Sequence, residues 1–270
     1  MNFPDPHNVG ALITELAHEI IIPRFGKLQA RDVHYKQENS PVTTADRLME
    51  ERMSVVLPDF CPGSIVVGEE AVAEDVNILL KARDHDCIWL LDPVDGTSNF
   101  VKGSHDFCAM LALIYQGRTV MSWIYFPMHD IMAIAANGDG AQVNERPLLL
   151  SPPPKTAMDW HGVINFNIFA REDRAAQRNL AKARFGTIQS LHCAGADFLK
   201  LSQGIRHFSL YRKIWPWDHA PGVLLLEEAG GTTRLLDAGV QYHPLDRVSG
   251  LLSCGSKNIC DDIANFAMMG

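Results

Sequence analysis

The feature that most constrains the fold is the segment at residues 87–100, CIWLLDPVDGTSNF, where an apolar run ends in two carboxylates. Its apolar half predicts a fully buried strand. Because a buried strand does not carry a charge into a core without compensation, Asp92 is expected to mark where the strand surfaces. Pro93 and Gly96 then favour a tight turn that directs the carboxylates of Asp92 and Asp95 into one small volume.

Two carboxylates held this close repel each other, and a shared proton or a bound cation relieves the repulsion. Thr97, Ser98 and Asn99 follow with donors at a predicted helix start, where an anion can be bound beside a cation. The alternative is a pair of simple turns, Asp-Pro followed by Asp-Gly, with no ligand. This segment alone does not decide between the two.

The chain length and charge restrict the classes of fold and partner. With 270 residues, we expect two lobes that share one core, at residues 1–150 and 151–270, divided by the proline-rich residues 151–154. A formal net charge of −8 without basic runs argues against nucleic acid or an anionic membrane as a partner. An anionic substrate would therefore need local cations.

The six cysteines are scattered without a CxxC pair, which predicts reduced, buried thiols. The first residues, MNFPDPHN, lack the pattern of a secretion signal, and no apolar run approaches the length of a membrane span. We therefore expect a cytoplasmic protein.

Three further acidic positions accompany predicted element ends. Asp46 lies in the first turn of a helix capped by Thr43 or Thr44, and capping alone accounts for it. A short strand at residues 64–67 ends in Gly68-Glu69-Glu70, so it carries carboxylates at the same end as the strand that leads to Asp92. The alternative is that Glu69 and Glu70 form a solvated turn. Asp218 is placed as the N-cap of a helix, which leaves one oxygen free for a metal.

The remaining pattern predicts a mixed fold. Residues 107–150 alternate apolar strands and turns, as in an antiparallel meander, and the glycine-rich turn at 137–140 fits a hairpin better than a phosphate loop. Beyond residue 154, strand-like and helix-like segments alternate, which favours a second α/β lobe.

Taken together, these motifs resemble the inositol monophosphatase family of lithium-sensitive, magnesium-dependent phosphatases. The resemblance covers nearly the whole chain and is carried, in order and approximate spacing, by Asp46, Glu69-Glu70, DPVDGT at residues 92–97, and Trp217-Asp218 followed by Gly230-Gly231. It implies a layered αβαβα sandwich with metal ions held between the lobes, and a homodimer.

The resemblance also implies roles for individual residues. Two or three Mg²⁺ ions would be held by Glu69, Asp92, the main-chain oxygen of Val94, Asp95 and Asp218. Catalysis would depend on Glu69 and on Thr97, which with Asp46 orients the attacking water. Substrate would be bound by Val94, Asp95, Gly96, Thr97, Gly195, Ala196, Tyr211, Arg212 and Asp218.

Physical chemistry supports these roles. Mg²⁺ prefers oxygen ligands and retains waters, and paired ions stabilise both the attacking and the leaving oxygen of an in-line displacement. Phosphoryl transfer needs mostly positioning and charge neutralisation, so direct attack by metal-activated water is expected. Zinc is not expected, because the clustered candidates are all oxygen ligands. His219 and Cys193 are given no catalytic role.

The sequence departs from the family pattern at Tyr211, where inositol-specific members carry an acid. A tyrosine cannot act as a carboxylate acceptor for a polyol, so inositol phosphate is disfavoured. Arg212 and Lys213 either bind a second anionic group or are ordinary surface cations. We expect a phosphomonoesterase for a small phosphorylated metabolite, with fructose bisphosphate, 3′-phosphoadenosine nucleotides and histidinol phosphate as candidates. The competing hypothesis is a regulatory or binding protein that retains the fold.

Overall fold

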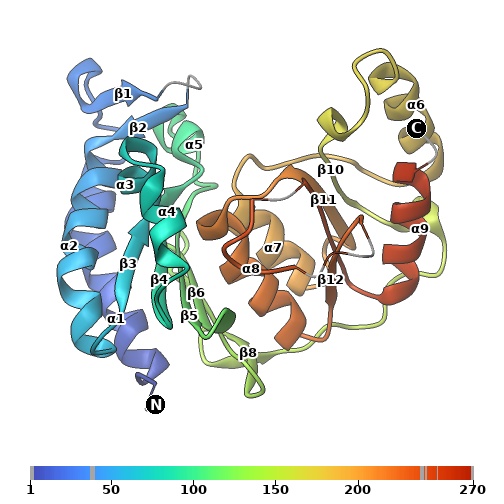
Figure 1. Cartoon of the computed structure of the whole chain (residues 1–270). Helices are drawn as coiled ribbons and strands as arrows, with labels where there is room; N and C mark the ends of the chain where they lie inside the picture. Colours follow the sequence, from blue (N-terminus) through green and yellow to red (C-terminus); the bar gives the residue numbers. More distant parts are fainter. Residues whose placement is uncertain (1–2, 37–39, 238–239, 241, 248, 269–270) are drawn as a thin grey trace.

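The chain folds into five layers, which confirms the expected αβαβα sandwich. The computed structural model describes residues 3–36, 40–237, 240, 242–247 and 249–268. Figure 1 shows the layers from the blue to the red side of the molecule: helices, a large sheet, two central helices, a smaller sheet and outer helices. Among the described residues, no helix is long and apolar enough to cross a membrane.

The helices and strands fall close to the ranges expected from the sequence. The helices are α1 (Pro6–Leu16), α2 (Thr44–Phe60), α3 (Glu69–Glu74), α4 (Asn77–Ala82), α5 (Thr97–Lys102), α6 (Arg174–Arg184), α7 (Ala194–Ser202), α8 (Pro216–Glu228) and α9 (Lys257–Met268). The strands are β1 (Val33–Tyr35), β2 (Pro41–Thr43), β3 (Ile65–Gly68), β4 (Cys87–Asp95), β5 (Cys108–Tyr115), β6 (Arg118–Phe126), β7 (Ile131–Ala136), β8 (Gly140–Val143), β9 (Arg146–Leu148), β10 (Gly162–Ile164), β11 (Phe208–Lys213), β12 (Thr232–Leu235) and β13 (Ser249–Cys254).

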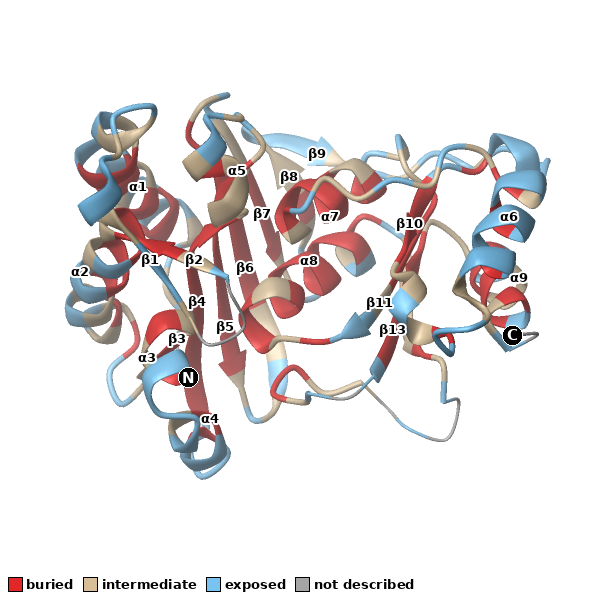
Figure 2. Cartoon of the chain, turned by 90° about the horizontal axis from the view of Figure 1, so that it is seen from above, coloured by how far each residue is buried: buried red, intermediate tan, exposed pale blue. Residues whose placement is uncertain are grey.

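The large sheet has seven strands in the order β3-β4-β5-β6-β7-β8-β9. β3 and β4 are parallel, whereas β4 to β9 pair antiparallel, so the predicted meander and its hairpin at residues 137–140 are confirmed. All nine residues of β4 are buried, because α2 covers one face of the sheet and α8 packs on the other. Figure 2 shows this central band of buried residues in red.

The smaller sheet has the order β10-β11-β13-β12, and α7 and α8 lie between the two sheets. α8 contacts the strands β4 to β8 of the large sheet and also β12 of the small one. The boundary expected at residues 151–154 falls between the two sheets, and the helices α7 and α8 that follow it pack back on the first sheet. The division of the chain into two lobes that share one core, at residues 1–150 and 151–270, stays a prediction.

Two local expectations are wrong. β4 does not surface at Asp92, which is 2% exposed, but continues to Asp95 with a shift of register between the two acids. α8 begins at Pro216 with Trp215 as its N-cap, so Asp218 is the third residue of the helix and not the cap. Proline is favourable in the first turn because its missing N–H has no partner there in any case, and this starts the helix earlier.

Candidate active site

The predicted acid cluster forms where two parallel strands end beside the first turn of α8. β3 and β4 pair in parallel register, so Glu69 at the start of α3 lies near Asp92 on β4. α8, which packs on the face of the large sheet opposite α2, adds Asp218. Ligand oxygens of Glu69, Asp92 and Asp218 all lie within 4.8 Å of one another. These acids therefore do not form the solvated turn considered for Glu69 and Glu70.

The electrostatics of this cluster favour a bound cation. Burial, followed by the charges of Glu69, Asp95 and Asp218, raises the pKa of Asp92 well above its usual value. The pKa of Asp218 is likewise raised by burial and by the charges of Glu69 and Asp95. A divalent cation relieves both the desolvation and the repulsion. Carboxylate oxygens are the ligands that Mg²⁺ prefers, so the donor set fits the expected ion.

Asp95 lines one cavity together with the three acids of this cluster. Contacts from the start of α7 hold its carboxylate. Its Oδ2 atom accepts a hydrogen bond from the N–H of Gly195 at 2.7 Å and one from the thiol of Cys193 at 3.1 Å. Burial raises the pKa of Asp95, while the hydrogen bond from Gly195 lowers it. Asp95 therefore connects the acid cluster to the start of α7.

Asp46 serves both a helix cap and the site. Its Oδ2 atom accepts from the main-chain N–H of Thr43 at 2.9 Å and from the Thr43 hydroxyl at 2.5 Å, which confirms the expected capping of α2 by Thr43. Its Oδ1 atom lies 3.1 Å from the hydroxyl of Thr97, which is also 2.9 Å from the main-chain oxygen of Val94. Burial raises the pKa of Asp46 to about 6. Capping therefore does not account for all of this carboxylate.

A cavity of about 280 Å³ joins these groups. Gly96 forms part of its floor with φ +83°, and a Cβ there would lie 2.9 Å from the main-chain oxygen of Asp106, so both conformation and space require glycine. The lining residues are Ser40, Glu69, Asp92, Val94, Asp95, Gly96, Thr97, Ser98, Lys102, His192 and Asp218.

Sequence reasoning gave no role to Lys36 and missed Glu50, two charged side chains that hold the α3 end of the cluster. The Lys36 ammonium lies 2.7 Å from Oε1 of both Glu69 and Glu70. Burial lowers the pKa of Lys36, but the charges of Glu69 and Glu70 outweigh this and raise it overall. The Glu50 carboxylate accepts hydrogen bonds from the first N–H groups of α3, at 2.9 Å from Glu70 and 2.8 Å from Ala71. No local sequence signal indicates these long-range contacts.

The predicted substrate residues of the second lobe take different positions. Gly195 supports Asp95 through its N–H, whereas Ala196 is 5% exposed and belongs to the same buried apolar cluster as Cys108. The Tyr211 hydroxyl donates to Asp197 Oδ2 at 3.0 Å, and its ring contacts His219 edge to face.

Arg212 lines a separate cavity of about 250 Å³ together with Lys213, Trp215 and Arg247. A third cavity of about 360 Å³ lies between the other two. It shares Trp215 and Arg247 with the Arg212 cavity, and Glu69 and Asp218 with the acid cluster.

Comparison with known proteins places the chain in one family over nearly its whole length. The model of the inositol monophosphatase family matches residues 8–262. A fructose-1,6-bisphosphatase/inositol-1-monophosphatase of Aquifex aeolicus is 28% identical over 236 residues, covering 86% of this chain and 85% of the relative. The Nus factor SuhB of Escherichia coli K12 is 28% identical over 245 residues, covering 87% of this chain and 86% of that protein.

Solved structures share the fold. A dual specific IMPase/NADP phosphatase bound with D-inositol-1-phosphate superposes with a TM-score of 0.79 at 20% identity, covering 97% of this chain and 96% of its own. An IMPase of Thermotoga maritima gives a TM-score of 0.80 at 21% identity, covering 97% of both chains. The match across nearly the whole chain shows that it belongs to the inositol monophosphatase family, a family of phosphatases that hydrolyse phosphoric monoesters.

Proposed function

We propose that this protein is a Mg²⁺-dependent phosphomonoesterase acting on a small phosphorylated metabolite. The observation that carries the proposal is the convergence of the Glu69, Asp92 and Asp218 oxygens on a cavity that the Thr97 hydroxyl also lines. Burial and the neighbouring charges raise the pKa of Asp92 and of Asp218, which is costly to the fold, and a divalent cation offsets that cost.

The ions would be held by the carboxylates of Glu69, Asp92, Asp95 and Asp218 and by the main-chain oxygen of Val94, as two or three Mg²⁺. When bound, Mg²⁺ supplies positive charge for the phosphate oxygens and lowers the pKa of water. The chain supplies the position of the ligands, because β4 and the first turn of α8 are both fixed in the core.

The Asp46–Thr97 pair orients the attacking water. With a pKa of about 6, Asp46 is mostly ionised at neutral pH and accepts a hydrogen bond from Thr97. The Thr97 oxygen then presents a lone pair toward the cavity that it lines, where it accepts a proton of the water. Gly96 and Thr97 at the start of α5 hold the phosphate through their main-chain N–H groups.

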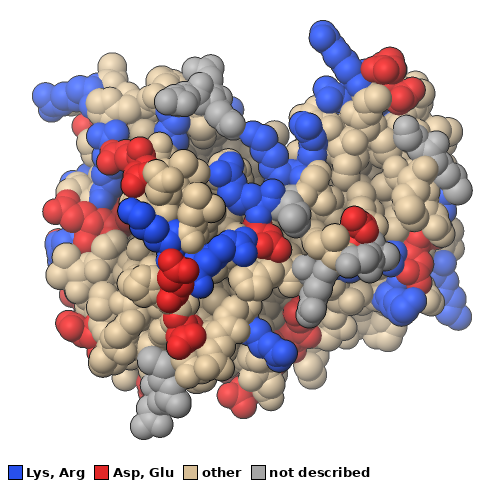
Figure 3. Space-filling view, viewed as in Figure 1, with Lys and Arg blue, Asp and Glu red and all other residues tan. Residues whose placement is uncertain are grey.

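The adjoining cavities favour a substrate that carries a second anionic group. Arg212 and Arg247 line a cavity that shares no lining residue with the cavity of the acid cluster, and the Arg247 guanidinium lies 3.9 Å over the ring of Trp215. Figure 3 shows Lys and Arg side chains gathered over the middle of this face, in a chain whose net charge is −8. Planar guanidinium groups suit phosphate or carboxylate. Tyr211 already donates to Asp197, which disfavours a polyol contact there.

A panel of phosphate monoesters tests this function. Sugar, polyol, nucleotide and amino-alcohol phosphates are assayed for phosphate release with Mg²⁺ and after chelation by EDTA. We expect metal-dependent release, with higher kcat/KM for substrates carrying a second anion. Release from none of the esters would reject the proposal, and equal kcat/KM for mono- and bis-anionic esters would reject the second-anion part.

A regulatory role is the second candidate, because several relatives are named Nus factor SuhB. Turnover separates the two: an enzyme of this class should reach ~1–10³ s⁻¹ on its substrate. Rates far below this on every ester, together with Mg²⁺ binding, would favour the regulatory role.

A further inference from the structure

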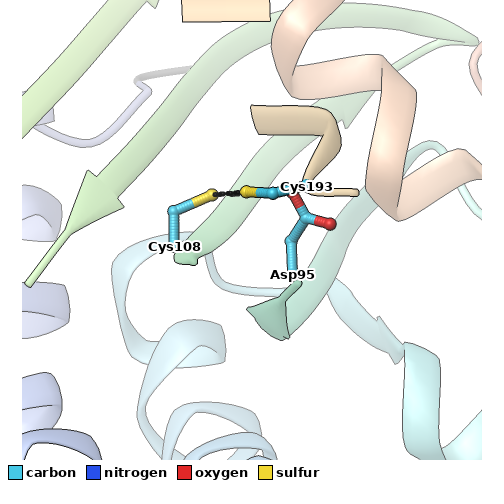
Figure 4. A group of neighbouring side chains, drawn as sticks. All are labelled: Asp95, Cys108 and Cys193. Atoms are coloured by element: carbon cyan, nitrogen blue, oxygen red, sulfur yellow. Dashed lines mark hydrogen bonds between the residues drawn. The ribbon is translucent and has the colours of Figure 1, made fainter. Parts of the chain in front are cut away.

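Two buried thiols meet the far side of the Asp95 carboxylate. Asp95 on β4 and Cys108 on β5 are paired in the sheet register, and Cys193 is the N-cap residue of α7. The three residues are 8%, 0% and 2% exposed. Figure 4 shows their side chains converging from three different elements. The residues are far apart in sequence, so no spacing motif indicates this cluster.

The distances within the cluster match one face of a tetrahedral zinc site. The two sulfurs lie 3.7 Å apart, and the Asp95 Oδ2 atom lies 3.6 Å from Cys108 Sγ and 3.1 Å from Cys193 Sγ. Zinc bound tetrahedrally, with about 2.3 Å to sulfur and 2.0 Å to oxygen, separates two sulfurs by about 3.8 Å and sulfur from oxygen by about 3.5 Å. The sulfur–sulfur distance and the distance from Asp95 Oδ2 to Cys108 Sγ therefore agree closely with a zinc site. The distance from Oδ2 to Cys193 Sγ must lengthen by a few tenths of an ångström.

We propose that Asp95, Cys108 and Cys193 form a binding site for a thiophilic divalent cation, Zn²⁺ or Cd²⁺. Two sulfurs and one carboxylate oxygen select such ions over Mg²⁺, which takes oxygen ligands. Three protein donors leave a fourth position for water. On binding, each thiol loses its proton to water, and the two thiolates and the carboxylate coordinate the ion.

The fold holds the donors in place without the ion. The N–H of Gly195 donates to Asp95 Oδ2, which fixes the carboxylate against the start of α7 beside the two thiols. A Cβ on Gly195 would lie only 2.4 Å from Cys108 Sγ, so α7 packs directly on this thiol. Since β4, β5 and α7 meet here in the core, the donors cannot move far apart.

The site has a functional consequence that rests on the proposed phosphatase activity. Asp95 belongs both to this cluster and to the proposed Mg²⁺ site, so an ion held by the thiols takes up the negative charge of Asp95 and weakens the binding of Mg²⁺. Zn²⁺ is then an inhibitor that added Mg²⁺ does not displace from the sulfurs.

Cadmium binding tests the site without any assay of activity. Cd²⁺ is titrated into the reduced protein with Mg²⁺ in excess, and the ultraviolet charge-transfer band of cadmium–thiolate bonds is followed together with calorimetry. We expect one tight ion per chain with the band of two thiolates. Removing a group that only supports a metal ligand weakens metal binding by about 10–100-fold. Removing a ligand itself should cost at least as much, so Cys193→Ser or Cys108→Ser should weaken Cd²⁺ binding by about 100-fold or more.

The Cys61–Cys87 pair supplies the matched control, because its buried sulfurs lie 3.0 Å apart at another place in the fold. Cys61→Ser/Cys87→Ser should keep the band and the affinity. Loss of the band in that variant, or its persistence in Cys108→Ser/Cys193→Ser, would overturn the proposal. If a serine variant at Cys108 fails to fold, Cys193→Ser alone decides.

An assay of phosphate release tests separately whether Zn²⁺ at this site inhibits the enzyme. If the protein hydrolyses a phosphate ester, Zn²⁺ should inhibit the parent enzyme at concentrations at which Cys193→Ser keeps the rate that it shows with Mg²⁺ and no Zn²⁺. If no ester is hydrolysed, the proposed function fails, while the cadmium titration still decides whether the site exists. Zn²⁺ inhibition that is equal in the parent and the variant would reject the consequence for Asp95.

Discussion

The acid cluster and the Arg212 end of the site differ in how firmly the fold holds them. Asp92 and Asp95 lie within a strand whose nine residues are all buried, and Asp218 lies in a helix packed between two sheets. Arg212 and Arg247 are exposed, and these long flexible side chains line their cavity together with Lys213, Ile214, Trp215 and Ser249. The proposed metal ligands are therefore built into the core, whereas the residues proposed to select the substrate lie on the surface, where side chains can change without disturbing the fold.

The largest effect is expected for Asp92→Asn. The substitution keeps the shape but removes a buried negative charge from the centre of the proposed metal site, so kcat should fall by more than about 10³-fold, or ~4 kcal/mol of barrier. The same change should raise the free energy of unfolding without Mg²⁺, because a buried charge that repels its neighbours is lost.

Asp84→Asn is the matched control, since Asp84 is exposed on the surface and should show neither effect. Phosphate release and urea unfolding with and without Mg²⁺ provide the two readouts. An Asp92→Asn enzyme with full activity would show that the core does not hold the metal ligands as proposed.

Thr97→Val should give the next largest effect. It removes the hydroxyl between Asp46 and the Val94 oxygen but keeps the branched shape, so kcat should fall by about 10²–10³-fold, as for other single groups that position reacting atoms. Thr97→Ser keeps the hydroxyl and should recover most of the rate. If the valine and serine variants are equally active, the pair with Asp46 is only a helix contact.

The two regions also differ in what the sequence could predict. The acid cluster was predictable because strand and helix ends are encoded locally: an apolar run followed by acids marks a strand end, and Trp217-Asp218 with Gly230-Gly231 marks the two ends of α8. The sequence predicts Asp92 at the surface because the local pattern does not show that β4 continues past Pro93. It predicts Asp218 at the cap because the pattern does not show that α8 already begins at Pro216.

Contacts between distant residues were not predictable in this way. Glu50 and Lys36 reach the α3 start from another helix and from β1–β2, and Cys108 meets Cys193 across 85 residues. These contacts depend on how elements pack and leave no periodic signal. The same limit applies to Arg247, which lines two neighbouring cavities through tertiary packing alone.

Arg247→Ala tests whether the exposed arginines bind a second anionic group of the substrate. If Arg247 binds a second anion at an exposed position, its loss should raise KM about tenfold for a bis-anionic ester and leave kcat nearly unchanged, since the interaction is equal in ground and transition states. Arg146→Ala removes an exposed arginine on β9 and serves as the control. An equal rise in KM for a mono-anionic ester would indicate a general charge effect and not a subsite.

The smallest effect is expected for Tyr211→Phe, and it tests which region Tyr211 belongs to. The family resemblance places Tyr211 on the substrate, but its hydroxyl donates to Asp197, which also interacts with Arg206. Loss of that hydrogen bond should lower the free energy of unfolding by ~1 kcal/mol, because Asp197 keeps its other partners. Ser209→Ala on the same strand changes a buried hydroxyl without touching Asp197 and provides the comparison. Should KM instead rise severalfold with stability unchanged, Tyr211 contacts substrate and the region that selects the substrate extends along β11 from Arg212 to Tyr211.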